Sequence, residues 1–400
     1  MFKAQATNAR QGLAALLVSS TGDMAAGLAL GFMTGTLERL PGLIVLVPAA
    51  IGMRGNIFGA LGSRLGTATH TGEYDGRLKL KLRSVGGQNV LASALLTLYI
   101  SIALAVLARE TARLFHVTTI PMLDYLTVSV VGGLISSLFV LGITVAVASV
   151  SVRRGWDMDN VSSPIVTAAG DLVTLPALWL ATFLLPIPHF SETVGAGSLV
   201  AVVLATLYIF RHQEMRLLHK IVKQSFFILV IAGLVDVVAG LTIGQRLEQF
   251  LVFPGILVLI PPFLEDAGAL GGILSARLAS KLHLGSIEPR TVPGRGSWED
   301  IALTYMLAVP VFGLVGLTGT LVSHAVGLAT PGLGLMVGLT LIAGAIATTG
   351  AVFVAYYSAV TSFRFGLDPD NFGIPLVTSS MDLVGALALI ATMVILGIAK

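Results

Sequence analysis

The sequence predicts an all-α polytopic membrane protein, built from two parallel five-helix repeats joined by one extra transmembrane helix. Three observations support this fold class. The 400 residues are 55% hydrophobic and only 11% charged, with a mean hydropathy of +0.91, whereas soluble domains carry roughly 25% charged residues. Apolar runs of membrane-spanning length recur along the chain, and two blocks of sequence recur in both halves.

Eleven apolar runs are long enough to cross a bilayer, which takes about 20 helical residues. They lie at residues 12–37, 41–62, 86–108, 122–150, 162–186, 193–210, 222–247, 253–276, 300–327, 331–360 and 373–398. Their polarity does not alternate as it would in barrel strands, so we predict helices. The first run continues past Asp23 without a clear cleavage site, so we expect a retained span and not a cleaved signal.

The positive charges predict how the spans are oriented. If the N-terminus is cytoplasmic and the spans alternate, few of the 24 Lys and Arg residues face outside: Arg39, Arg109, Arg113, Arg246 and Lys400. Such a bias is the positive-inside pattern. Omitting the short run 193–210 would invert every later segment and remove the bias. We therefore expect a multi-pass protein of the cell membrane, with its N-terminus in the cytoplasm and its C-terminus outside.

An internal repeat relates the two halves of the chain. Residues 41–48 read PGLIVLVP and residues 254–261 read PGILVLIP. The same register, extended backward, aligns Asp23 with Asp236. A second block aligns Asp171 with Asp382, in the segments DNVSSPIVTAAGDLV and DNFGIPLVTSSMDLV. Polar residues that recur in register are unexpected for unrelated apolar helices, so we infer a duplication.

Five spans are an odd number, so two directly joined repeats would have opposite orientations. The extra helix restores the orientation of the second repeat. The predicted parts are a first repeat at 1–189, a linking helix with its cytoplasmic connector at 190–220, and a second repeat at 221–400. A pseudo-two-fold axis along the membrane normal would relate the repeats, and a shared pore can form at such an axis.

Carboxylates inside the predicted spans are the leading functional candidates, because each costs a few kcal/mol to insert. Asp171 follows Thr167 by four residues, and Asp382 follows Thr378 by four, so each pair shares a helix face. If both faces met at the axis, a cation between the carboxylates would keep them ionised. Mg²⁺ suits this place, because it takes oxygen ligands and needs only one or two carboxylates. Two protonated structural aspartates are the alternative.

Further polar residues could line the same path. Asp23 and Asp236 form a second repeated pair, for which a hydrogen bond near a helix end is the alternative. In the second span of each half, glycine and proline accompany Asn56 in one half and Asp266 in the other. An interrupted helix of this kind is tolerated against protein or a water-filled cavity. A kink with a local ion pair is the alternative there.

The two halves differ at this level. The first carries Arg54 and Asn56, and the second carries Glu265 and Asp266, so a pore between them would be asymmetric. The chain has no Cys, no P-loop and neither HExxH nor GxSxG, so thiol chemistry, ATP-driven transport and standard hydrolysis lack support. The net charge of +3 does not indicate a nucleic-acid partner. We expect membrane lipid and a divalent cation as partners, and no enzymatic activity.

An intramembrane aspartyl protease is the alternative from another class, with Asp171 and Asp382 as its dyad. The local sequences are Ala-Gly-Asp and Ser-Met-Asp. Neither resembles the Tyr-Asp and Gly-x-Gly-Asp pair of such proteases. A membrane scaffold without transport is a third, weaker alternative.

Residues 48–65, PAAIGMRGNIFGALGSRL, resemble the second-helix motif of MgtE-like magnesium transporters, in the solute carrier family 41 branch. The resemblance covers essentially the whole chain. It implies two five-helix units in one chain with a pore between them. It also implies that Asp171 and Asp382 bind Mg²⁺ as the substrate ion, and that Thr167 and Thr378 offer backbone carbonyls.

One departure from the family pattern is Ala269, which stands where the first half has Asn56. Because the first predicted span begins near the N-terminus, we expect no gating by cytosolic sensing or CBS domains. One chain supplies both halves of the pore, so a monomer can act alone, and a homodimer stays open. Passive conduction and exchange for Na⁺ or H⁺ both stay open, as do other divalent cations.

Overall fold

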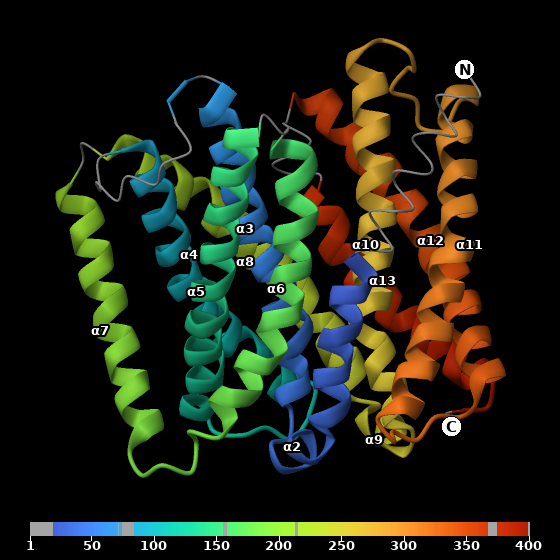
Figure 1. Ribbon diagram of the computed structural model, residues 1–400, viewed down its shortest axis with the longest axis horizontal. Helices are drawn as coiled ribbons and strands as arrows, with labels where there is room; N and C mark the ends of the chain where they lie inside the picture. Colours follow the sequence, from blue (N-terminus) through green and yellow to red (C-terminus); the bar gives the residue numbers. More distant parts are fainter. Residues whose placement is uncertain are drawn as a thin grey trace. The chain divides into compact units, whose positions relative to one another are not determined.

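The computed structural model describes residues 19–70, 72–73, 84–154, 158–212, 215–366 and 374–398, and within these ranges it contains helices and no strands (Figure 1). Residues 19–32 form the first helix. The other elements are α2 (Thr34–Arg39), η1 (Leu43–Leu46), α3 (Val47–His70), α4 (Val85–Leu114), α5 (Met122–Arg154), α6 (Met158–Thr182), α7 (Phe190–Arg211), α8 (Arg216–Gly244), α9 (Leu247–Val252), α10 (Pro254–His283), α11 (Arg295–Ala325), α12 (Leu333–Phe365) and α13 (Ile374–Ile395).

Ten helices of the described ranges are long and apolar enough to cross a membrane, and each corresponds to one predicted span. The shortest predicted run, 193–210, is the 22-residue helix α7. The remaining run, 12–37, begins outside the described residues, and its described part is helical over 19–32. The prediction of an all-α polytopic membrane protein is therefore confirmed.

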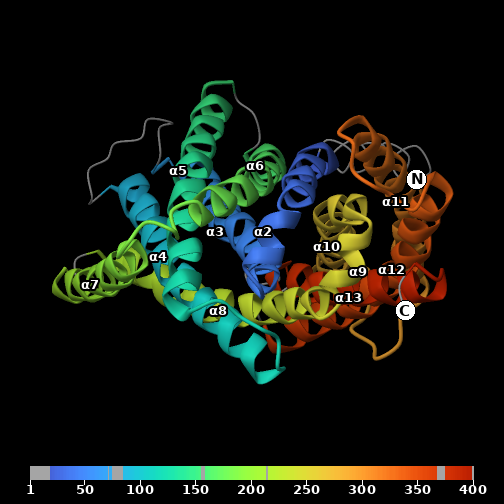
Figure 2. The ribbon, with the colours of Figure 1, turned by 90° about the horizontal axis from the view of Figure 1, so that it is seen from below.

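The described contacts divide the chain into two compact units. Unit 1 takes its described residues from Met1–Thr34 and Val238–Lys400, and unit 2 is Gly35–Val237. In unit 2, α3 packs against α4, α5 and α6, and α5 also packs against α4 and α6 (Figure 2). In unit 1, α10 packs against α11, α12 and α13, and α12 also packs against α11 and α13. Corresponding helices of the two repeats thus make the same packing pairs.

The first helix of each repeat groups with the other repeat's helices. Residues 19–32 belong to unit 1, where a Cβ added at Gly27 would overlap the carbonyl oxygen of Val258 and lie 2.9 Å from its carbonyl carbon. A Cβ at Gly31 would lie 2.9 Å from Val258 Cγ2. Small residues allow such close helix packing in membranes. Conversely, α8 belongs to unit 2 up to Val237, and Gly233 there faces Leu104.

The compact units therefore do not follow the order of the chain. Grouping by contact is a different property from sequence duplication, so the predicted boundaries at 1–189, 190–220 and 221–400 stay a prediction. The orientation of the termini likewise stays a prediction.

The packing of Gly27 and Gly31 shows why the first helix needs small residues on the face that meets α10.

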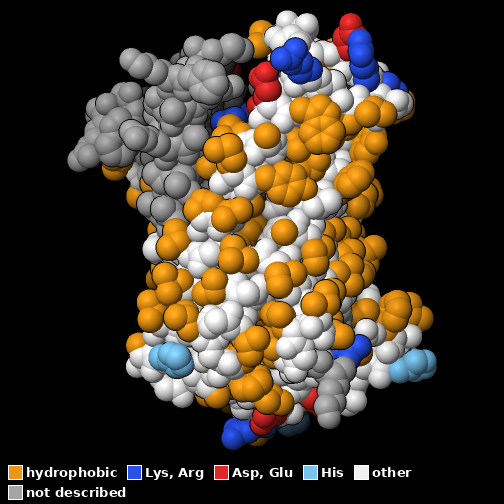
Figure 3. Space-filling view, turned by 90° about the vertical axis from the view of Figure 1, so that its right-hand side faces the viewer, with side chains coloured by type: hydrophobic (Ala, Val, Ile, Leu, Met, Phe, Trp, Pro, Cys, Tyr) orange, Lys and Arg blue, Asp and Glu red, His pale blue; other side chains and the backbone are white. Residues whose placement is uncertain are grey.

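The surface of unit 1 in Figure 3 carries apolar side chains along its middle, and charged side chains gather at its two ends. Exposed apolar residues of α11 and α12 include Met306, Val309, Leu321 and Phe353. Large apolar side chains facing outward along two spans are typical of helices that contact lipid. This surface agrees with the ten candidate spans, and the chain is a multi-pass membrane protein.

Candidate functional site

The two leading aspartates are buried, one in each unit. Asp171 lies on α6 in unit 2 and is 0% exposed, and Asp382 lies on α13 in unit 1 and is 9% exposed. Both carboxyls are therefore held inside protein and away from the lipid-facing surface. That position fits the expectation that an intramembrane carboxylate faces the interior of the bundle.

A close helix crossing precedes each aspartate by one turn. On α3, a Cβ added at Gly55 would lie 3.5 Å from Thr167 Cγ2. On α10, a Cβ added at Gly268 would lie 3.6 Å from the Cα of Thr378. Gly55 and Gly268 are aligned in the sequence repeat, and so are the two threonines. Each unit thus builds the same glycine–threonine crossing between the second and fifth helices of its repeat, and an added Cβ there would make ordinary van der Waals contact with the threonine.

Asp266 on α10 is hydrogen-bonded to the helix that carries Asp23, another predicted carboxylate of unit 1. It is 1% exposed, and its Oδ2 accepts a hydrogen bond of 2.7 Å from the hydroxyl of Ser20. Within the described residues its buried Oδ1 has no hydrogen-bond partner. Asp23 follows Ser20 by three residues on the same helix and is 0% exposed. The Ser20 hydroxyl therefore connects α10 to the helix of Asp23.

The other predicted residues are divided between the units: Asn56, Thr167 and Asp236 belong to unit 2, and Thr378 belongs to unit 1. Asn56 is half-buried on α3 beside Gly55, and Asp236 is 0% exposed on α8. Thr167 and Thr378 are both half-buried. In the described part of the chain, no three His, Cys, Asp or Glu residues gather closely enough to hold a metal ion by themselves. That Asp171 and Asp382 face each other stays a prediction.

Arg54 forms a buried polar centre that joins three helices of unit 2. Its side chain is 1% exposed. Nε donates to Ser136 Oγ on α5 at 3.1 Å, and Nη2 donates to Ser101 Oγ on α4 at 3.3 Å. Nη1 has no hydrogen-bond partner among the described residues, and no described carboxylate forms an ion pair with Arg54. Since a guanidinium inside a membrane costs several kcal/mol, its retention indicates a role.

Arg54 also makes the two units unequal. In the repeat register its position corresponds to Ala267 on α10. Gly170 of α6 is the residue before Asp171, and a Cβ added there would lie 3.3 Å from the Cβ of Arg54 on α3. The fixed positive charge therefore belongs to unit 2, at the helix crossing beside its leading aspartate. The sequence located Arg54 within a span, but the serines that hold it and Ser20 carried no signal beyond being polar residues in apolar runs.

Replacing Gly133 by Ala should displace the Arg54 guanidinium. The added Cβ would overlap Ser101 Oγ and lie 2.5 Å from Arg54 Nη2. We expect a loss of about 2 kcal/mol, from overpacking and from a broken hydrogen bond to a charged group, seen as a lower thermal midpoint of the purified protein. Gly142→Ala on the same helix, where an added Cβ meets nothing within 4 Å, is the matched control. Equal midpoints for the two variants would show that Arg54 adjusts without cost.

The fold and its buried carboxylates define a polytopic membrane protein with charged groups in its interior, which is the general pattern of ion transporters. The family model described as MgtE, a divalent cation transporter, matches residues 47–181 and again 260–392. The chain therefore belongs to the MgtE family of divalent cation transporters. The two matches cover α3 to α6 and most of α10 to α13.

Its relatives include members of solute carrier family 41. It is 26% identical to rat solute carrier family 41 member 3 over 92% of this chain and 83% of the relative. It is 26% identical to chicken member 2 and 27% identical to human member 2, in each case over 94% of this chain and 68% of the relative. No solved structure gives a significant match. The predicted family resemblance is confirmed, and the family consists of transporters and not of enzymes.

Proposed function

We propose that the divalent cation transported by this protein is Mg²⁺, and that Asp171 and Asp382 bind the partly hydrated ion in a path between the two repeats. The main support for this proposal is that the same helix crossing occurs in both units. In each unit, a buried aspartate lies one turn after the same glycine–threonine contact. Membership in a divalent cation transporter family supports the class of substrate.

The chemistry of the residues favours a hard cation. Two carboxylates inside a membrane repel each other when both are ionised, and a divalent cation between them removes the repulsion. Mg²⁺ keeps several waters and is bound by one or two carboxylates, so it does not need a complete cage of protein ligands. The backbone carbonyls of Thr167 and Thr378 would complete the first contacts, as the family resemblance implies.

The remaining polar residues would line the path beyond this point. The buried Oδ1 of Asp266, which has no partner among the described residues, can accept a hydrogen bond from water bound to the ion. Asn56 of unit 2 and the two repeated aspartates, Asp23 and Asp236, would contribute further oxygens. In this proposal the N-terminus is cytoplasmic and the basic connectors face the cytoplasm.

Ion flux into proteoliposomes tests this function. Purified protein is reconstituted, and Mg²⁺ entry is followed with an internal indicator, with protein-free vesicles as the control. We expect saturable Mg²⁺ entry driven by an inside-negative potential. Flux of Mn²⁺, Co²⁺ or Ca²⁺ without Mg²⁺ flux would overturn the choice of ion. Imposed Na⁺ and H⁺ gradients separate the two modes, because an exchanger needs a counter-gradient and a passive pathway does not.

A further inference from the structure

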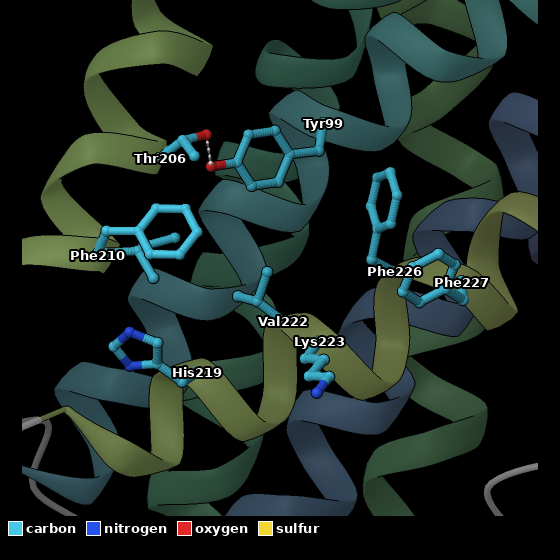
Figure 4. Close-up of a pocket in the computed structure, with 9 residues that line it drawn as sticks. Tyr99, Thr206, Phe210, His219, Val222, Lys223, Phe226 and Phe227 are labelled. Carbon is cyan, nitrogen blue, oxygen red and sulfur yellow. Dashed lines mark hydrogen bonds between the residues drawn. The ribbon is translucent and has the colours of Figure 1, made fainter. Parts of the chain in front are cut away.

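A cavity of about 420 Å³ lies between α4, α7 and α8 in unit 2 (Figure 4). Its wall is mainly apolar and aromatic. Phe210 comes from α7, and Val222, Phe226 and Phe227 come from α8. Pockets that hold a small ligand are roughly 300–1,000 Å³ in volume, so this cavity can take one flexible hydrocarbon chain. None of its residues belongs to the candidate cation site.

The two ends of the cavity differ in chemistry. At one end, the hydroxyls of Tyr99 and Thr206 are 2.9 Å apart and hydrogen-bonded to each other. At the other end, the side chains of His219 and Lys223 lie near the start of α8 (Figure 4). Because each hydroxyl already has a hydrogen-bond partner, the end at Tyr99 and Thr206 carries no charge and, among the described residues, no polar group without a partner. The cationic end is the place where a ligand's charge would be recognised.

A basic stripe leads from the end of the helix to the cavity. Arg216, Lys220 and Lys223 recur at spacings of four and three residues, which places them on one face of α8. All three are exposed, and Arg211, the last residue of α7, is exposed as well. No ion pair is formed by these four residues within the described part of the chain. The stripe is therefore an exposed set of cations that ends at an apolar cavity.

The part of the cavity wall formed by α7 and α8 includes exposed aromatic side chains that can contact lipid. In α7, Phe210 is 70% exposed, and in α8, Phe227 is 65% exposed. The positive charge of this end also predicts a cytoplasmic position. Anionic lipids concentrate in cytoplasmic leaflets, and each Lys or Arg near that surface attracts them. A zwitterionic lipid would bring a positive group of its own to the stripe, and a soluble anion would leave the apolar wall uncovered.

We propose that this cavity binds one acyl chain of an anionic phospholipid, whose phosphate lies on Lys223 and the basic residues beside it. The aromatic side chains hold the hydrocarbon, and the cations select the headgroup. A lipid bound here would fill the space between the linking helix α7 and helices α4 and α8. It would thereby hold α7, of which few side chains are buried, against the rest of unit 2.

Lipid retention measured by native mass spectrometry tests the proposal. The full chain in detergent is mixed with palmitoyl-oleoyl phosphatidylglycerol or with phosphatidylcholine of the same chains. We expect about 25-fold greater retention of the phosphatidylglycerol, as two cation contacts of about 1 kcal/mol each imply. We expect Lys223→Gln to reduce that retention about fivefold. Val222→Trp should reduce retention of both lipids, because the indole ring would occupy the cavity.

Arg295→Gln is the matched control, since it removes one exposed cation from the same predicted side but outside the cavity. It should leave retention unchanged. Equal retention of the two lipids by the unaltered protein, or equal losses in Lys223→Gln and Arg295→Gln, would overturn the proposal. Displacement of the lipid by an excess of glycerol phosphate would overturn the role of the acyl chain. If Val222→Trp does not fold, the comparison of the other two variants still decides.

Discussion

Replacement of both Asp171 and Asp382 by Asn is expected to reduce Mg²⁺ flux in proteoliposomes by about a hundredfold or more. Each exchange removes a charge-assisted contact to the ion or its water, which contributes about 1.5–3 kcal/mol, and two such losses exceed a factor of one hundred. Asn has nearly the same shape as Asp, so the helix crossings at Thr167 and Thr378 should remain. Each single variant should show an intermediate flux, measured in the same vesicles.

A matched aspartate separates loss of the ion site from a general effect. Asp124 lies in the first turn of α5 and accepts a hydrogen bond of 2.7 Å from Ser191. Asp124→Asn can keep that bond through its carbonyl oxygen, so its flux should equal that of the unaltered protein. The thermal midpoint of the double variant should not fall, because a buried carboxylate is replaced by a neutral group. Substantial flux in a well-folded double variant would remove both aspartates from the path.

Gly27→Ala should cause the largest loss of stability. The new Cβ would overlap the carbonyl oxygen of Val258 and lie 2.9 Å from its carbonyl carbon and 3.2 Å from its Cα. These are backbone atoms of α10, and Val258 is fully buried. Relief therefore requires one whole helix to shift. We expect a cost of about 3 kcal/mol, measured as a lower thermal midpoint and a smaller monodisperse fraction after purification.

Gly35→Ala is the control for this prediction. Gly35 lies in the short helix α2, is exposed, and an added Cβ there meets nothing within 4 Å. Because Ala is favoured over Gly in helices by up to about 1 kcal/mol, this variant should be as stable as the unaltered protein or more so. A midpoint for Gly27→Ala equal to that of Gly35→Ala would mean that residues 19–32 do not depend on close contact with α10.

Sequence and structure agree most closely on the elements themselves. The weakest predicted span, 193–210, is the helix α7, and the repeat that paired Asp171 with Asp382 appears as matching crossings in both units. In the first helix, Gly27 and Gly31 pack closely against α10, while a Cβ at Gly35 would meet no neighbour. The sequence could not show which helix those glycines would contact.

The sequence by itself determined the fold class, the spans and the paired aspartates, because span length, hydropathy and the register of a repeat are properties of consecutive residues. The tertiary structure alone decided that residues 19–32 pack with α10, that Ser101 and Ser136 hold Arg54, and that a cavity lies beside Lys223. Lipid and helix interiors are almost equally apolar, so hydropathy does not distinguish a buried face from a lipid-facing one. Helix association in membranes depends instead on close packing and on hydrogen bonds between segments far apart in the chain.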